Sequence, residues 1–274
     1  MTRPSIVAAL VRKLAPKHSR SVWTPEPGAE KQSSRAENSP DAHVQDRQPH
    51  FVRDYEGFVD MLLANFSKDE AMSHAVGGAY EETGLKERAI LEYAGLKPGM
   101  SLVDIGCGSG RLASSLTDFP LQYLGTDVVQ KLLDYATAKA PAAFRFMRHT
   151  ELNVPVESAS VDMICAFSVF THLQHTETYI YLQDFLRALK PGGKVVFSFL
   201  EFATDHHWPV FATTVDQFKA GTMPHLNMFI ERDVIKVWCA HLGFEVDQIV
   251  DGADAPWAGK PLGQCTAILR KPAA

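Results

Sequence analysis

From residue 101 onward, short apolar runs alternate with longer segments whose apolar residues recur every three or four positions. The short runs predict strands at 101–105, 122–127, 144–148, 161–167 and 194–200. The longer segments predict helices at 109–119, 128–140 and 177–190, and a helix at about 230–241 leads into two more strand-like segments, 244–250 and 264–269. This alternation predicts an α/β fold, a doubly wound and mostly parallel sheet with helices on both faces.

The chain before residue 101 has a helical pattern without strands. Apolar residues at helical spacing predict a helix over residues 51–66. Ser67 with Glu70 forms the capping-box signature of a second helix. Thr83 is the expected N-cap of a third helix that ends near Gly95.

Residues 1–50 differ in composition from the rest. Prolines and polar residues between about 15 and 50 predict that most of this segment is disordered. In residues 1–20, Ile6, Leu10 and Leu14 follow one another at helical spacing among arginines and lysines. This pattern is compatible with a basic amphipathic helix that weakly contacts a membrane surface or a protein, but the simpler interpretation, a solvated tail, is preferred. We therefore divide the chain into a tail (1–50), an N-terminal helical part (51–100) and an α/β domain (101–274) with an insertion near 201–229.

Composition limits the class of protein. The chain has 274 residues, 46% hydrophobic and 22% charged, as is usual for a soluble domain. A formal net charge of -5 argues against a nucleic-acid partner. None of the four cysteines has C-x-x-C spacing, so we predict neither a metal site nor a redox pair. Reduced cysteines are typical of a cytoplasmic protein, and no apolar run reaches the roughly 20 residues that span a membrane.

The stretch from Val103 to Arg111 carries the clearest candidate chemistry. A strand-like run leads into Gly106, Gly108 and Gly110, and a helix-like segment follows at once. Such a turn brings a ligand close to the main chain at a helix N-terminus. The spacing is G-x-G-x-G, and the third glycine of the dinucleotide fingerprint G-x-G-x-x-G would fall on Arg111. A pyrophosphate-binding loop is therefore disfavoured.

This stretch resembles motif I of the class I S-adenosylmethionine-dependent methyltransferases. A second acidic residue, Asp127, ends the next predicted strand 17 residues past Gly110 and can accept hydrogen bonds from both hydroxyls of a ribose. The resemblance covers roughly residues 77–270. It implies a Rossmann-like sheet of seven strands with a final antiparallel hairpin at 244–250 and 264–269, N-terminal helices that form a lid, and S-adenosyl-L-methionine as cofactor.

Ligands of open α/β sheets lie across the carboxyl ends of the strands. The strand ends and the resemblance together select the candidate cofactor residues Asp104, Gly106, Cys107, Gly108, Gly110, Asp127, Val128, Thr150, Glu151, Leu152 and Phe167. Within this set, Asp104 is expected to order the glycine turn and Asp127 to bind the ribose. The resemblance implies that Thr150 or Glu151 meets the adenine and that Val128 or Leu152 packs on its faces.

The acceptor side must supply a base if the acceptor is an alcohol or a phenol, because its proton must be removed. The candidates after the fourth and fifth strands are His172, His206 and His207. Each also has a structural alternative. His206 and His207 stand next to Asp205, but the three are too closely spaced for a usual facial metal site. Candidates for the acceptor pocket are Phe202, Trp208, Phe211, Met223, His225 and Trp257, although such residues more often simply pack a core.

The resemblance implies a methyltransferase that acts on a small molecule, most readily on oxygen. The stretches Phe167–Leu173 and Leu262–Cys265 look like those of bacterial enzymes that modify sugars, polysaccharides or secondary metabolites. Methylation of nitrogen or carbon is the alternative within the family. A nicotinamide-dependent oxidoreductase and a non-catalytic cofactor-binding protein are the alternatives from other classes.

Overall fold

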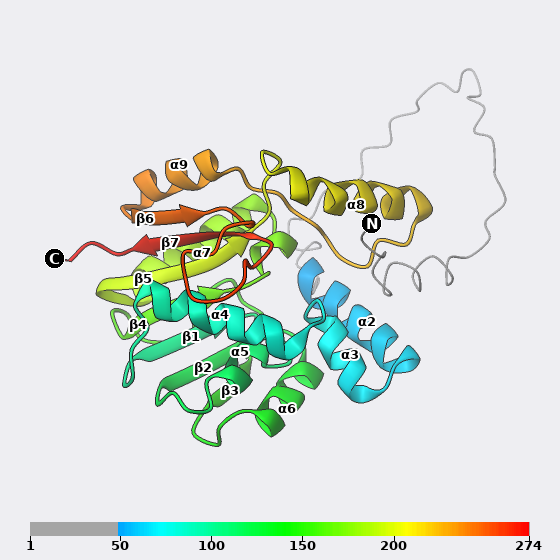
Figure 1. The fold of residues 1–274 in the computed structure, drawn as a ribbon, viewed down its shortest axis with the longest axis horizontal. Helices are drawn as coiled ribbons and strands as arrows, with labels where there is room; N and C mark the ends of the chain where they lie inside the picture. Colours follow the sequence, from blue (N-terminus) through cyan, green and yellow to red (C-terminus); the bar gives the residue numbers. More distant parts are fainter. Residues whose placement is uncertain (1–48, 274) are drawn as a thin grey trace, which may run out of the picture.

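The computed structural model describes residues 49–273, so the expected tail, with its basic segment 1–20, lies outside the described residues. Its strands form one seven-stranded sheet in the order β3-β2-β1-β4-β5-β7-β6 (Figure 1). Their bounds are β1 (Ser101–Ile105), β2 (Gln122–Asp127), β3 (Arg145–Arg148), β4 (Val161–Ala166), β5 (Leu189–Phe199), β6 (Glu245–Val250) and β7 (Cys265–Arg270). The predicted doubly wound sheet is confirmed.

Only β7 runs against the direction of the other strands. It pairs antiparallel with both β5 and β6, which confirms the expected final hairpin. The remaining pairs, β1 with β2 and β4, β2 with β3, and β4 with β5, are parallel. The strand order reverses between β1 and β4, and this is where open α/β sheets place a ligand.

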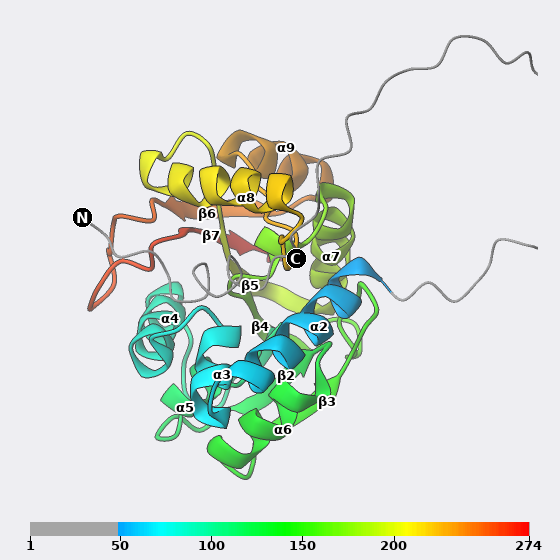
Figure 2. The same cartoon turned by 90° about the vertical axis from the view of Figure 1, so that its right-hand side faces the viewer.

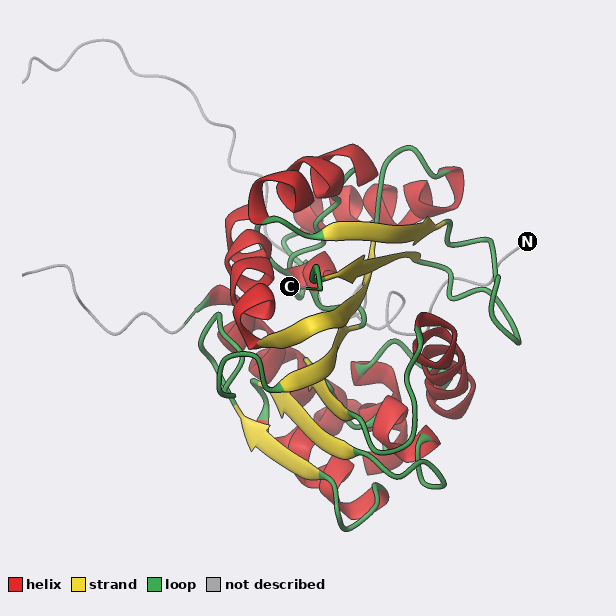
Figure 3. Cartoon of the chain, turned by 90° about the vertical axis from the view of Figure 1, so that its left-hand side faces the viewer, coloured by secondary structure: helices red, strands yellow, loops and turns green. Residues whose placement is uncertain are grey.

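Helices cover both faces of the sheet (Figure 3). They are α2 (His50–Asn65), α3 (Lys68–Ala75), α4 (Tyr80–Ala94), α5 (Arg111–Ser115), α6 (Gln130–Lys139), α7 (His175–Ala188), α8 (Trp208–Ala220) and α9 (Arg232–Leu242), with the short 3₁₀ turns η2 (Phe170–His172) and η3 (Asp205–His207). Because successive strand residues point to opposite faces, Val103 packs with α7 and α9, whereas Leu102 packs with α4 and α5. Burial on both faces explains why the central strands read as continuous apolar runs.

The N-terminal helices follow the sequence prediction with one shift. Ser67 and Glu70 form the expected capping box at the start of α3. The third helix, α4, begins at Tyr80, so Thr83 is not its N-cap; Ala79, in a left-handed conformation, takes that place. Gly95 ends the helix as predicted, with φ of 108°. A separate apolar cluster joins α2 and α3 to α6, which holds these helices against the domain.

Two helices differ from their predictions. The helix after the glycine turn is shorter than the predicted 109–119, because Gly110 keeps a left-handed backbone with φ of 82° and α5 begins only at Arg111. The insertion near 201–229 contains α8, which the sequence pattern did not predict. Trp208, Phe211, Val215 and Phe218 of this helix recur at helical spacing, but none of its residues is buried.

Within residues 49–273, no helix combines the length and the hydropathy that crossing a membrane requires. The four cysteines are all buried and free.

Candidate active site

A cavity of about 370 Å³ opens at the carboxyl ends of the strands. Figure 2 views the molecule from this edge, where α2 and α3 cross in front of the sheet. Residues of the glycine turn and of β2 line one part of the cavity, and residues of α2, of the turn after β4 and of the insertion line the other. The cavity therefore lies where the strand order reverses and where α2 covers it.

The glycine turn brings its main chain to the cavity surface. Gly106 and Gly108 both line the cavity and have φ of 63° and 56°, which L side chains rarely adopt. A Cβ atom on Gly106 would lie 2.5 Å from Cγ2 of Val169, and one on Gly108 would lie 2.5 Å from Cγ1 of Val76. Sterics and backbone conformation thus both require glycine at these two positions.

Gly110, the third glycine of the motif, has a different task. It does not line the cavity, and a Cβ atom there would lie 2.7 Å from Cβ of Ala136 on α6. Its small size allows the start of α5 to pack closely against α6. Among the sequence candidates it is therefore placed as a packing residue.

Asp127, at the end of β2, lines the cavity and is anchored by the main chain. Its Oδ2 accepts the backbone N–H of Gly108 at 2.9 Å, and its Oδ1 accepts that of Val129 at 2.9 Å. Burial raises the pKa of Asp127 from its usual value, while these backbone hydrogen bonds oppose that rise. Each carboxylate oxygen keeps a second lone pair that can accept a hydrogen bond from a ligand.

Asp104, at the floor of the cavity, is bound by side chains of neighbouring strands. The hydroxyl of Tyr123 donates to its Oδ2 at 2.6 Å, and the thiol of Cys165 donates to its Oδ1 at 3.4 Å. Burial raises the pKa of Asp104 to about 7. These bonds fix the carboxyl group directly beneath the turn that begins at Gly106.

A buried ion pair between Glu87 and Arg111 also lines the cavity, and sequence reasoning did not find it. Nε of Arg111 donates to Oε1 of Glu87 at 2.8 Å, and another guanidinium nitrogen donates to the carbonyl of Val76. Glu87 is only 1% exposed and Arg111 is 9% exposed. The pair connects α4, α5 and the segment after α3. Its members lie 24 positions apart, and nothing in either residue alone signals the contact.

His172 is the one sequence-predicted base that lines the cavity. Its Nδ1 donates to the carbonyl oxygen of Leu226 at 2.8 Å, so Nε2 is the unprotonated nitrogen of the neutral ring. Nε2 has no hydrogen-bond partner among residues 49–273. Burial, reinforced by nearby His225, lowers the pKa of His172 to about 3. The ring is therefore neutral near pH 7 and can accept a proton at Nε2.

Rings from α2, from η2 and from the insertion meet beside His172. The His172 and His225 ring centroids lie 4.6 Å apart, and Tyr55 stacks on His225 with centroids 5.3 Å apart. Phe58 meets the edge of His225 at 5.2 Å. We call Tyr55, Phe58, His172 and His225 the aromatic cluster. Of the six acceptor-pocket candidates taken from the sequence, only His225 lines the cavity.

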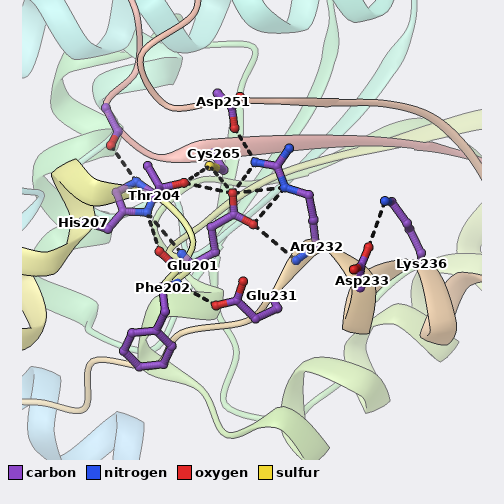
Figure 4. Close-up of polar contacts among 11 residues, drawn as sticks. Glu201, Phe202, Thr204, His207, Glu231, Arg232, Asp233, Lys236, Asp251 and Cys265 are labelled. Atoms are coloured by element: carbon purple, nitrogen blue, oxygen red, sulfur yellow. Dashed lines mark hydrogen bonds and ion pairs between the residues drawn. The ribbon is translucent and has the colours of Figure 1, made fainter.

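His206 and His207 do not line the cavity. Nε2 of His207 donates to the carbonyl of Gly263 at 3.1 Å, and its Nδ1 accepts the backbone N–H of Glu201 at 3.1 Å (Figure 4). Both ring nitrogens are thus engaged by the main chain, and burial lowers the pKa of this histidine. His206 is exposed and contacts the ring of His207. The structure brings neither of them together with His172.

Next to His207, a network of hydrogen-bonded polar side chains lies at the carboxyl end of β5 (Figure 4). Glu201 is fully buried and accepts hydrogen bonds from Arg232, Thr204 and Cys265. Burial raises the pKa of Glu201, but these donors outweigh it and leave the pKa at about 2. The guanidinium of Arg232 also pairs with Asp251. This guanidinium thus bridges the carboxylates of Glu201 and Asp251. The resulting ion-pair network connects α9 to the sheet.

The loop after β3, which was expected to meet an adenine, lines the cavity through a different residue. Thr150, Glu151 and Leu152 do not line it, whereas the preceding residue, His149, does. Nε2 of His149 bonds to the side-chain oxygen of Asn153 at 2.9 Å, and its backbone N–H donates to the carbonyl of Asp127. Apart from Gly110, the other cofactor candidates do line the cavity: Asp104, Gly106, Cys107, Gly108, Asp127, Val128 and Phe167.

The part of the chain that forms the glycine turn and Asp127 is similar to known proteins. Residues 103–197, which hold the glycine turn and Asp127, match the model of a methyltransferase domain. The fold is similar to that of magnesium protoporphyrin IX methyltransferase from Synechocystis, solved with bound S-adenosylmethionine, with a TM-score of 0.56 and 15% identity over 83% of this chain and 100% of that one. Residues 103–197 therefore carry a methyltransferase domain, and the structure has the fold of S-adenosylmethionine-dependent methyltransferases.

Two curated relatives of this methyltransferase illustrate the range of the family. A ubiquinone biosynthesis O-methyltransferase from Nitrosococcus oceani is 26% identical over 166 residues, covering 55% of this chain and 66% of that protein. Phosphoethanolamine N-methyltransferase 1 from Arabidopsis thaliana is 26% identical over 154 residues, covering 53% of this chain and 30% of that protein. The methyltransferase chain thus spans less than two thirds of the length of either relative.

The residues of the cavity fit S-adenosylmethionine, the cofactor of this family. Gly106 and Gly108 line the cavity without a side chain of their own, so a ligand can approach their main chain closely. The unused lone pairs of Asp127 suit the two ribose hydroxyls. Carboxyl groups and the Arg111 guanidinium line the same half of the cavity and match the charges of an amino-acid tail.

Proposed function

We propose that this methyltransferase transfers a methyl group from S-adenosylmethionine to a hydroxyl oxygen of a small molecule. The observation that carries the proposal is the free Nε2 of His172 in the cavity that also contains Asp127 and the glycine turn. A hydroxyl acceptor must lose a proton during the transfer, and His172 is a neutral base within that cavity.

The parts of the cavity have separate tasks in this proposal. When bound, S-adenosylmethionine supplies an electrophilic methyl carbon, and the electron pair of the breaking carbon–sulfur bond remains on sulfur. The glycine turn and Asp127 orient the donor, which is the main requirement of an in-line displacement. Phe51, Tyr55 and Phe58 of α2 line the cavity and exclude water from it. His172 holds the acceptor proton at Nε2.

Oxygen is preferred over nitrogen as the acceptor atom because a neutral amine already presents a lone pair and needs no base. The relative from Nitrosococcus oceani is named an O-methyltransferase, which supports this choice. The acceptors expected from the sequence, a sugar, a polysaccharide or a secondary metabolite, all offer hydroxyl groups.

Binding of S-adenosylhomocysteine and of NAD, each measured by calorimetry, tests the cofactor assignment. We expect S-adenosylhomocysteine to bind and NAD not to bind. Transfer of a radiolabelled methyl group to a panel of hydroxyl and amine compounds then tests the reaction. Binding of NAD alone would overturn the proposed function, and methylation of amines only would overturn the choice of oxygen.

A further inference from the structure

The two halves of the cavity differ in their charged groups. Among residues 49–273, every carboxylate and guanidinium that lines it, from Glu87, Asp104, Arg111 and Asp127, belongs to α4, β1, α5 or β2. The half formed by α2, by the turn after β4 and by the two loops that precede α9 and β7 contributes only uncharged side chains and neutral histidines. An acceptor with a phosphate or an ammonium group would bury a charge there without a counter-ion, which is unfavourable.

Few polar atoms on this uncharged half are free to bind an acceptor. Within the described part of the chain, the Tyr55 hydroxyl has no hydrogen-bond partner, and neither does Nε2 of His172. Oε1 of Gln264 accepts from Ser198 at 2.7 Å, which leaves its amide nitrogen free. A sugar buries several hydroxyl groups that all need partners, whereas a ring with one or two hydroxyl groups needs few.

The remaining surface of this half is apolar and largely aromatic. Phe51 and the aromatic cluster line it together with Val169 and Leu173. Tyr55 stacks on His225 with an interplanar angle of 15°, so the cluster contains a flat, two-ring stack. Offset stacking and edge contacts with such rings favour a planar aromatic ligand.

We propose that the acceptor is a neutral phenolic compound whose ring packs against the aromatic cluster, with its hydroxyl group at Nε2 of His172. This inference rests on the proposed function and narrows its acceptor class. The phenolic O–H bond breaks, its proton passes to Nε2 of His172, and its electron pair forms the new bond from oxygen to the methyl carbon. The imidazolium then releases the proton to water.

The acidity of the acceptor agrees with this assignment. A phenol ionises near pH 10, whereas an alcohol ionises near the value of water, about 15.7. Burial lowers the pKa of His172 to about 3, so this ring is a weak base. A phenol is therefore roughly six pKa units easier for it to deprotonate than a simple alcohol.

Binding to the full-length protein saturated with S-adenosylhomocysteine tests the proposal independently of turnover. Calorimetric titrations with catechol, methyl glucoside and phosphoethanolamine represent a phenol, a sugar and a charged acceptor. We expect catechol to bind and the other two not to bind. In the corresponding assay with S-adenosylmethionine, catechol should be methylated on oxygen.

Variants then locate the binding surface. Tyr55→Leu and His225→Leu should each weaken catechol binding about tenfold, the effect of losing one aromatic contact, while S-adenosylhomocysteine affinity stays within about twofold. Trp208→Leu removes an exposed aromatic residue outside the cavity and serves as the matched control. Thermal denaturation of each variant shows whether it has folded. If one of the two cluster variants does not fold, catechol binding by the other one tests the proposal.

The outcomes separate the two proposals. Failure to bind S-adenosylhomocysteine would overturn the proposed function itself. If S-adenosylhomocysteine binds but methyl glucoside or phosphoethanolamine binds in preference to catechol, or if none of the three binds, the phenolic assignment is wrong. Catechol binding that survives both cluster replacements unchanged would overturn it as well.

Discussion

Nδ1 of His172 donates a hydrogen bond of 2.8 Å to the carbonyl oxygen of Leu226, across 54 positions of sequence. His172 ends the turn after β4, and Leu226 lies in the insertion between β5 and α9. A second main-chain bond, from the N–H of Met228 to the carbonyl of Thr171, holds the same two segments together at 2.7 Å. The insertion therefore determines which nitrogen of His172 is free to act as a base.

Replacing His172 by glutamine should lower turnover by about 10²–10⁴-fold, the usual contribution of a general base. Affinity for S-adenosylhomocysteine should stay unchanged, because the base serves the acceptor. His206→Gln is the control, since His206 is exposed and lies outside the cavity. Steady-state kinetics and calorimetry give both quantities. Equal losses in the two variants would remove His172 from this role.

The same histidine should make stability depend on pH. Its folded-state pKa of about 3 lies below the usual 6.5, so the unfolded chain binds the extra proton and stability falls as pH decreases from about 6.5 to 3. Between pH 7 and pH 5 this group should cost the wild type about 2 kcal/mol. Urea denaturation at both pH values should show a smaller loss, by that amount, in His172→Gln. Identical pH dependence in both proteins would contradict the buried neutral ring.

Replacing Asp127 by asparagine should weaken binding of S-adenosylhomocysteine by about 1–3 kcal/mol, the cost of losing charged hydrogen bonds. Asp127 now accepts hydrogen bonds from two backbone N–H groups. In the asparagine variant, the amide N–H₂ would face one of these donors and could not accept its hydrogen bond. Calorimetry measures the change. Asp134→Asn, on the exposed side of α6, should bind like the wild type. Unchanged affinity in Asp127→Asn would mean that this carboxylate does not hold the ribose.

Replacing Glu87 by glutamine should destabilise the fold by about 3–5 kcal/mol, because Arg111 would keep a buried charge without its partner. Chemical denaturation measures the loss. The double replacement of Glu87 and Arg111 by methionine should recover most of it, since a buried apolar pair avoids the cost of removing both charges from water. If the double variant is no more stable than Glu87→Gln, the charge pair does not explain the effect.

Two glycine-to-alanine replacements within helices should have opposite signs. Alanine at Gly57, in α2, would find nothing within 4 Å of its Cβ and should stabilise the protein by about 0.5–1 kcal/mol. Alanine at Gly84, in α4, would bring its Cβ to 2.3 Å from the carbonyl oxygen of Arg111 and should destabilise it by about 1–3 kcal/mol. Thermal and urea unfolding measure both. A stabilising Gly84→Ala would show that α4 and α5 do not approach so closely.

Local signals in the sequence were enough for the sheet and for Gly106, Gly108 and Asp127, which line the cavity, but not for Glu87 and Arg111 beside them. Continuous apolar runs predicted the strands because the central strands are buried on both faces. Gly106, Gly108 and Asp127 could be selected because a strand-end rule places the ligand site. The helix α8 was not predicted, although Trp208, Phe211, Val215 and Phe218 recur at helical spacing, and it buries none of its residues.

By itself, the sequence determined the sheet, the glycine turn and the position of Asp127, since each depends on residues that are neighbours along the chain. Tertiary structure alone decided that His172, and neither His206 nor His207, lines the cavity. Tertiary packing also brings Tyr55 of α2 and His225 of the insertion together at the cavity. The physical reason is distance along the chain. Contacts such as Glu87 with Arg111 or His172 with Leu226 join segments that are far apart in the sequence, and no local pattern in either segment indicates its partner.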